Sequence, residues 1–309
     1  MKIALMFPGQ GSQTVGMGKE LYDKYPQAKE IIDQAGDELK KIIFEGPEET
    51  LKMTKYTQPA IFTVSMAAFE VLKENINFAK NEFVAAGHSL GEYSALCAAG
   101  FFSFKDGLSM VKARGEYIQK ASESNPGTMA AIMGLEEAVV KDICKQASIV
   151  GVCEPVNFNS PGQIVIAGTV DAVNKAVELA NAAGAMKCVV LNVSGPFHSS
   201  LMSPAADMMA EELKKYDFIS PGFGVYTNCD AVLTKDSAIV KDKLVKQIKS
   251  AVRWDQSIQN IINDGFDKFI EVGPGKVLAG LLKRIDRSKK ALNVEDAASL
   301  EKTIQELGK

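Results

Sequence analysis

Short apolar runs alternate with longer amphipathic stretches along most of the chain. The runs at 2–7 and 82–87 consist almost entirely of apolar residues and predict two buried strands. Apolar residues at helical spacing predict helices at 57–75, 90–99 and 105–122. Two more strands are predicted near 223–226 and 268–272. This alternation predicts a large α/β domain.

The rhythm changes after the turn sequence "SNPG" at 124–127. The following residues predict the order strand, helix, strand, strand, helix, strand, at 128–133, 136–147, 148–153, 163–168, 170–183 and 186–191, with "NFNSPG" as a turn. This order is that of a ferredoxin-like unit. We therefore expect a ferredoxin-like small subdomain at 125–192, inserted into a large α/β domain formed by 1–124 and 193–309.

Composition and charge narrow the class of protein. A net charge of −3 argues against nucleic-acid binding, and no apolar run reaches the roughly 18 residues of a membrane span. The amino terminus has too short an apolar run for a signal peptide and is expected to be a strand. The five cysteines are scattered without a C-x-x-C pair, and only two histidines are present, which favours reduced thiols and no metal site. We expect a cytoplasmic protein, and nothing demands more than a monomer.

The residues Gly87-His88-Ser89-Leu90-Gly91 fit the pattern G-x-S-x-G. This pattern marks a nucleophilic serine when a strand precedes it and a helix follows, because the sharp turn exposes the hydroxyl. Both conditions are predicted here, and backbone N–H groups at the start of a helix favour an oxyanion. The alternative is a serine that only caps a buried helix.

Either histidine is a candidate base for this serine. A residue next to the nucleophile on such a turn points away from it, so His88 is disfavoured. His198 follows a predicted strand and a Ser-Gly-Pro turn, a loop position suited to a base that acts across a cleft. No Asp or Glu stands out as the group that orients it, and a structural role for His198 remains the alternative.

An arginine interrupts the apolar stripe of the predicted helix 105–122. The residues three and four positions from Arg114 are Met110, Val111, Tyr117 and Ile118. No acidic partner is therefore available on the helix, and an unpaired buried guanidinium is unfavourable. Two interpretations stay open: a structural charge that pairs elsewhere or reaches water, or a clamp for a substrate carboxylate.

Two glycine-rich segments do not fit nucleotide-binding motifs. In "FPGQGSQTVGMGKE" at 7–20, Thr14 stands where a dinucleotide fingerprint needs glycine, and Met17 stands where a P-loop needs lysine. Such a loop beside a nucleophilic serine can instead donate the second N–H to an oxyanion. The segment "EVGPGKVLAG" at 271–280 is expected to be a turn between a strand and a helix.

Several of these motifs occur together in one known family. They are "FPGQGSQ", "GHSLGE", "RG" at 114–115, "GTMAAIMGL", "NFNSPGQIVIAG", "FHSSLM" and "EVGPGKVL". With these motifs, nearly end to end and in this order, the chain resembles the malonyl-CoA–acyl carrier protein transacylases and the acyltransferase domains of polyketide synthases. The resemblance implies an α/β-hydrolase-like core with a ferredoxin-like insert.

The resemblance also implies roles for individual residues. Ser89 would be the acylated nucleophile and His198 its general base. The backbone N–H groups of Gln10 and Leu90 would form the oxyanion hole. The histidine would be oriented by a backbone carbonyl instead of an acid, and the alignment of "VKQIKSAVRW" assigns that carbonyl to Gln247.

Acyl selectivity is implied by three further positions. Arg114 would hold the free carboxylate of malonate. Phe197 would favour malonyl over a branched acyl group, because relatives that take methylmalonyl carry serine there. Ile118 stands where the family often has methionine, a change that keeps an apolar wall.

The implied reaction is transfer of malonyl from malonyl-CoA to the phosphopantetheine thiol of acyl carrier protein, by a ping-pong mechanism through a malonyl-serine. Coenzyme A enters only as the substrate thioester, so no cofactor or metal is expected. The alternatives are a serine thioesterase or other hydrolase, an acyltransferase of a polyketide pathway, and a non-catalytic scaffold that binds carrier protein. The chain length of a single acyltransferase favours fatty-acid synthesis over a polyketide pathway.

Overall fold

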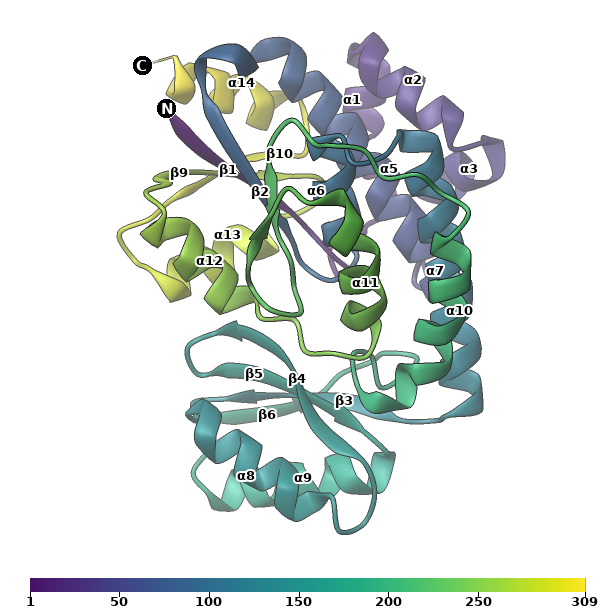
Figure 1. Ribbon diagram of the computed structural model, residues 1–309, viewed down its shortest axis with the longest axis vertical. Coiled ribbons are helices and arrows are strands. Elements are labelled where there is room, and N and C mark those ends of the chain that lie inside the picture. Colours follow the sequence, from purple (N-terminus) through teal and green to yellow (C-terminus); the bar gives the residue numbers. More distant parts are fainter. Residues whose placement is uncertain (309) are drawn as a thin grey trace.

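A computed structural model describes residues 1–308, which form two sheets with helices packed on them (Figure 1). The large sheet has the strand order β10-β9-β1-β2-β7-β8 and the small one β4-β5-β3-β6. The strands are β1 Lys2–Phe7, β2 Glu82–Gly87, β3 Thr128–Met133, β4 Cys153–Ser160, β5 Gln163–Gly168, β6 Lys187–Val190, β7 Gly224–Tyr226, β8 Leu233–Thr234, β9 Lys268–Val272 and β10 Ala291–Val294.

From Ile3 to Phe7 the central strand of the large sheet, β1, is entirely apolar, because helices cover both of its faces. It pairs in parallel with β2 on one side and with β9 on the other. Ile3, Leu5 and Phe7 pack into one hydrophobic cluster, and the alternate residues Ala4 and Met6 pack into a second cluster on the opposite face. Because β1 and β2 are parallel, their carboxyl ends and the loops that follow them lie at one edge of the sheet.

Helices α12 and α13 cover one face of this sheet, and most of the other helices cover the opposite face. The α-helices are α1 Lys19–Lys24, α2 Pro26–Gln34, α3 Asp37–Glu45, α4 Glu48–Leu51, α5 Thr54–Asn75, α6 Gly91–Ala99, α7 Phe104–Ser124, α8 Glu137–Ala147, α9 Val170–Ala182, α10 Ser203–Leu213, α11 Ser237–Ile248, α12 Trp254–Asn263, α13 Val277–Ile285 and α14 Ala297–Leu307. Short 3₁₀ turns lie at Phe78–Lys80 and Ser200–Met202. Among residues 1–308, none of these helices combines the length and apolarity needed to cross a membrane.

The small sheet is antiparallel and carries α8 and α9 on one face (Figure 1). Its strands stand in the spatial order second, third, first, fourth of the unit, which is the ferredoxin-like arrangement. Its other face packs against Val193 and Phe197, and β4 is bonded to the large domain through backbone hydrogen bonds at Val252. The predicted fold class, an α/β-hydrolase-like large domain with a ferredoxin-like insert, is confirmed, whereas the exact division at 125–192 stays a prediction.

One predicted strand is wrong. The segment 148–153 is not a strand; β4 begins at Cys153 and continues through most of the predicted "NFNSPG" turn. The side chains of Ile149 and Val150 are 88% and 52% exposed, so this apolar run lies on the surface instead of in a sheet. Gly151, with φ 153°, then redirects the backbone into β4, whose own alternation is broken by a register shift after Pro155.

Candidate active site

The turn between β2 and α6 holds Ser89 in a backbone conformation that favours glycine. Ser89 has φ 52°, and α6 begins two residues later at Gly91. A Cβ at Gly87 would overlap the carbonyl of Gly91, and a Cβ at Gly91 would overlap the carbonyl of Phe7. The two glycines therefore permit the close packing of β1, the turn and α6 that exposes the Ser89 hydroxyl.

Replacing Gly91 with alanine is expected to displace this turn. The new Cβ must push the end of β1 away, which we expect to lower the free energy of unfolding by about 1–3 kcal/mol and to misplace the Ser89 hydroxyl. Chemical denaturation measures the first effect, and acylation of Ser89 measures the second. Gly280→Ala is the matched control, since Gly280 lies on the exposed side of α13 with open space at its Cβ and alanine favours a helix. Normal stability and acylation in Gly91→Ala would contradict the packing argument.

Ser89 and His198, far apart in the sequence, lie in hydrogen-bond contact. Ser89 Oγ is 2.7 Å from His198 Nε2, and His198 Nδ1 is 2.8 Å from the backbone oxygen of Gln247. The Gln247 carbonyl accepts only, so Nδ1 carries the proton and Nε2 is left as the acceptor for the serine hydroxyl. Burial and the nearby positive charge of Arg114 lower the pKa of His198 to about 3, which keeps the imidazole neutral.

The guanidinium of Arg114 is buried beside the same hydroxyl. Its Nη1 donates to Gln58 Oε1 at 2.6 Å, and its Nη2 donates to Gln247 Oε1 at 2.9 Å and to Ser89 Oγ at 3.2 Å. It is 1% exposed, and burial lowers its pKa from the ordinary value. Within residues 1–308 it forms no ion pair with a carboxylate, so it is not one half of a structural ion pair. Because it is buried, its charge does not reach water either.

Gln10 and Leu90 lie beside the serine from two different loops. Both line a small cavity of about 40 Å³ whose other walls are Gln58, Ser89, Arg114, Ile118, Phe197, His198, Met202 and Ile248. Within the described residues, the backbone N–H groups of Gln10 and Leu90 have no hydrogen-bond acceptor. Two N–H groups without a partner beside a hydroxyl form a suitable site for an oxyanion.

Comparisons with known proteins agree with this geometry. Residues 5–309 match the family described as "Acyl transferase domain". The chain belongs to the acyl transferase family. It is 44% identical to the malonyl CoA-acyl carrier protein transacylase of Bacillus subtilis, over 99% of this chain and 97% of that protein. It is 43% identical to the Escherichia coli K12 protein of the same name, over 92% of this chain and 93% of that one.

Solved structures show the same relationship. The acyl-carrier-protein-S-malonyltransferase of Bartonella henselae superposes with a TM-score of 0.96 at 41% identity and covers 100% of both chains. A second structure is a malonyl-transacylase in complex with a type II polyketide-synthase acyl carrier protein, with a TM-score of 0.95 and 39% identity. It covers 99% of this chain and 100% of that one. The fold of this acyl transferase is therefore that of its relatives throughout its length.

A second cavity of the acyl transferase, of about 190 Å³, adjoins the first and lies between the two subdomains. It shares Gln10, Ser89, Phe197 and His198 with the small cavity. The remaining walls come mainly from the small sheet and the segment that follows it: His88, Met129, Asn157, Asn159, Val165, Leu191 and Val193. This cavity offers a route between the subdomains to the Ser89 hydroxyl.

The other histidine points away from the serine, as the sequence predicts for this neighbour. His88 Nε2 lies 2.8 Å from Asn159 Oδ1 of the small sheet, and its ring lies 5.7 Å from that of Trp254. His88 therefore bridges the two subdomains. It is not placed to accept a proton from Ser89.

Three polar residues of the site were not predicted from the sequence. Gln58 holds the Arg114 guanidinium, and Glu92 accepts a hydrogen bond from Gln247. Asn228 fixes the turn, since its Oδ1 accepts from the Ser89 N–H at 2.8 Å and its Nδ2 donates to the Gly87 carbonyl at 2.7 Å. The only available signal was for Glu92, which ends the "GHSLGE" motif; Gln58 and Asn228 stand in no recognisable spacing.

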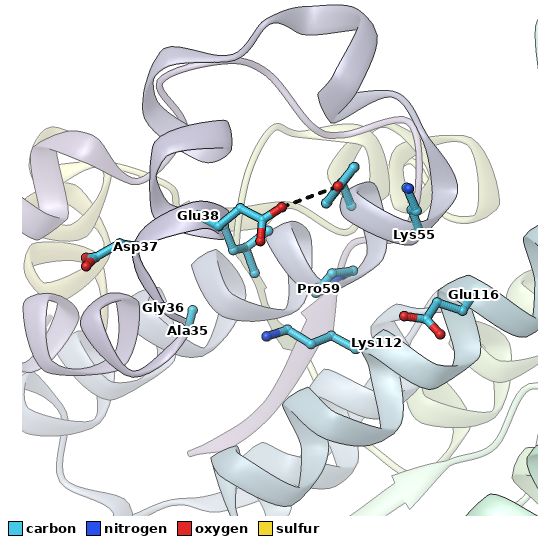
Figure 2. A pocket seen from close by; sticks show the side chains of 10 residues that line it. Ala35, Gly36, Asp37, Glu38, Lys55, Pro59, Lys112 and Glu116 are labelled. Atoms are coloured by element: carbon cyan, nitrogen blue, oxygen red, sulfur yellow. Dashed lines mark hydrogen bonds between the residues drawn. The ribbon is translucent and has the colours of Figure 1, made fainter.

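A larger surface cavity, of about 430 Å³, lies away from this chemistry, between α3, α5 and α7 (Figure 2). Its walls carry Lys55 and Lys112 but also Asp37, Glu38 and Glu116, so its charges are mixed. Neither Ser89 nor His198 borders it. The candidate residues Ser89 and His198 line the two smaller cavities instead.

Proposed function

We propose that this enzyme transfers the malonyl group of malonyl-CoA to the phosphopantetheine thiol of acyl carrier protein. The observation that carries the proposal is the Arg114 guanidinium, which is buried, lacks a carboxylate partner and lies 3.2 Å from the Ser89 hydroxyl. An acyl chain on Ser89 that ends in a carboxylate would supply that partner. The names of the relatives support the same acyl group and the same carrier.

In the first half-reaction Ser89 would be the nucleophile and His198 the general base. His198 Nε2 takes the hydroxyl proton while Ser89 Oγ attacks the thioester carbonyl, and the N–H groups of Gln10 and Leu90 hold the oxyanion. The intermediate then collapses, the carbon–sulfur bond breaks, and His198 returns the proton to the departing coenzyme A thiolate. The product is a malonyl ester on Ser89. The carbonyl of Gln247 keeps the imidazole in the required tautomer throughout.

In the second half-reaction the thiol of the carrier protein's phosphopantetheine would attack this ester. His198 accepts the thiol proton and returns it to Ser89 Oγ as the ester bond breaks. The cavity between the subdomains would admit both the coenzyme A thioester and, in the second step, the phosphopantetheine thiol. No metal ion or bound cofactor takes part in this scheme, and a relative in complex with an acyl carrier protein supports that partner.

Arg114, Phe197 and Ile118 would set the acyl selectivity. Arg114 pairs with the malonyl carboxylate, and an acetyl group would leave its charge desolvated and unpaired. Phe197 and Ile118 line the small cavity that contains Ser89 Oγ, and they limit the volume of a branch on the acyl chain.

The test is the mass of the intact protein after mixing with malonyl-CoA in the absence of carrier protein, followed by peptide mapping. A malonyl adduct on the Ser89 peptide that carrier protein then removes would support the transferase. Continuous release of free malonate and coenzyme A would indicate a thioesterase instead. No adduct and no release would indicate a scaffold that only binds carrier protein.

The acylation rate is expected to change less than about threefold between pH 8 and pH 5. The neutral imidazole is the active form and is lost as the pH falls through its pKa, which is about 3 for His198. An ordinary histidine, with a pKa of about 6.5, would be only about 3% neutral at pH 5, and the acylation rate would fall about 30-fold between pH 8 and pH 5. Single-turnover acylation, quenched and read by mass, measures the profile.

Glu92 supplies the control for this profile, because burial raises its pKa to about 7. An inflection near pH 7 that disappears in Glu92→Gln belongs to Glu92. An inflection near pH 6.5 that persists in Glu92→Gln would contradict a buried, neutral His198.

Three expectations about the setting of the enzyme remain part of the proposal. The five cysteines are all free thiols, which fits a reducing compartment such as the cytoplasm. A monomer suffices, because all the proposed site residues come from one chain. Fatty-acid synthesis is the proposed pathway, and assays with carrier proteins of both pathways would distinguish it from polyketide synthesis.

A further inference from the structure

Glu92 is a buried carboxylate that the scheme above does not use. It lies in the first turn of α6, is 1% exposed, and forms no ion pair with Arg114. Its Oε2 accepts from Gln247 Nε2 at 2.7 Å and from the backbone N–H of Asn228 at 3.2 Å. A buried carboxylate is unfavourable without such donors, so its presence three residues after Ser89 needs an explanation.

The side chain that Glu92 holds, Gln247, joins all the proposed reacting groups. Its Nε2 also donates to the Ser89 backbone oxygen at 2.8 Å, and its Oε1 accepts from Arg114 at 2.9 Å. The backbone oxygen of the same residue accepts from His198 at 2.8 Å. Gln247 is fully buried, and all of these bonds depend on where it sits.

The orientation of the Gln247 amide follows from its two acceptors. An amide nitrogen has two hydrogens, and these are directed to Ser89 O and to Glu92 Oε2. Turning the amide over would place its oxygen against both acceptors and its nitrogen against the Arg114 donor. Without Glu92 one of the two restraints on the nitrogen is lost, and space opens beside the side chain.

We propose that Glu92 is a positioning residue that holds Gln247 so that its two oxygens face His198 and Arg114. Glu92 thereby aligns the base and the carboxylate clamp together, although it touches neither the substrate nor the reacting atoms. This inference rests on the proposed acyl transfer.

The experiment compares single-turnover malonylation and acetylation of Glu92→Ala, Glu92→Gln and the wild-type protein. In Glu92→Ala the malonylation rate constant is expected to fall about 10²-fold, the loss typical of a small misplacement of reacting groups, and the ratio of malonyl to acetyl rates is expected to fall with it. In Glu92→Gln the new amide oxygen can accept from both donors, so the rate is expected to recover to within about threefold. Rate constants are compared instead of amplitudes, because a fraction of unfolded protein lowers the amplitude but not the rate constant of the folded protein.

Glu271→Ala is the matched control for the loss of a buried carboxylate. Glu271 is fully buried, and its two oxygens accept from the N–H groups of Leu278 and Ala279 at the start of α13, outside both active-site cavities. Its removal is expected to lower the thermal midpoint while the folded protein keeps the wild-type rate and selectivity. The same pattern in Glu92→Ala would show a merely structural role and would overturn the proposal.

A second pair of variants tests whether Glu92 acts through Gln247. In a Gln247→Ala background, Glu92→Ala is expected to change the malonylation rate less than about twofold, because residues that act as one unit are not additive. A full further loss would mean that Glu92 acts through Asn228 and the serine turn, and would overturn the proposal. Failure of the wild-type protein to form a malonyl adduct would instead count against the proposed function itself.

Discussion

Replacing Ser89 with alanine is expected to abolish the malonyl adduct and to lower malonyl transfer by at least about 10⁴-fold. Ser89 Oγ lies 2.7 Å from the base His198 and 3.2 Å from Arg114, and alanine leaves no atom in that position that can attack a thioester. Any residual rate would come from the remaining groups of the site, which still bind the substrate and polarise its thioester carbonyl. Intact mass after mixing with malonyl-CoA, and transfer to carrier protein, measure both effects.

Ser94→Ala is the matched control. Ser94 is buried in α6, five residues after Ser89, and its hydroxyl has no hydrogen-bond partner in the described chain. Its removal is expected to leave the adduct and the transfer rate unchanged. An adduct that persists in Ser89→Ala on another residue would contradict the proposed nucleophile.

The sequence predicts the part of the site that depends on local pattern. Ser89 is marked by its flanking glycines between a strand and a helix, and Arg114 by its position on an apolar stripe. The structure places both in one cavity with His198, which the sequence could propose only as a loop histidine. Their catalytic and binding roles remain proposals until the variants are measured.

The rest of the site could not be predicted from local pattern, because it consists of contacts that the fold alone creates. The atom that orients His198 is a backbone oxygen of Gln247, which any residue could provide, so only the family resemblance pointed to it. Glu92 meets Gln247 and Asn228 across more than 130 residues of sequence. No periodicity or spacing records such a long-range contact between common polar residues.

The misplaced strand at 148–153 has a related physical origin. An apolar run is buried only if another layer covers it, and Ile149 and Val150 stay mostly exposed. In the actual strand β4, Pro155 and a bulge break the alternation that marks a strand. The central strands β1 and β2 were predicted at their observed bounds because both faces are buried and the pattern is unambiguous.

Replacing Arg114 with alanine is expected to lower malonylation by about 10²- to 10³-fold while acetylation is unchanged or rises. The guanidinium is buried, and it donates hydrogen bonds to the side-chain oxygens of Gln58 and Gln247. Both glutamines are neutral, so no negative charge in direct contact balances the positive charge of Arg114. The carboxylate of a malonyl group can pair with this positive charge, whereas an acetyl group has no charge to pair with it. The measurement is the ratio of single-turnover rate constants for malonyl-CoA and acetyl-CoA.

Loss of stability must be separated from loss of selectivity in this variant. Truncation leaves two buried glutamine oxygens and Glu92 without the guanidinium, which we expect to lower the free energy of unfolding by about 3 kcal/mol. Rates are therefore measured below the thermal midpoint of each variant, and Arg114→Lys provides a cation without the planar fork. Arg284→Ala, which removes an exposed guanidinium bonded to Gln163, is the control and should leave the ratio unchanged. A folded Arg114→Ala protein that keeps its preference for malonyl would remove Arg114 from the carboxylate site and, with it, the observation on which the proposed substrate rests.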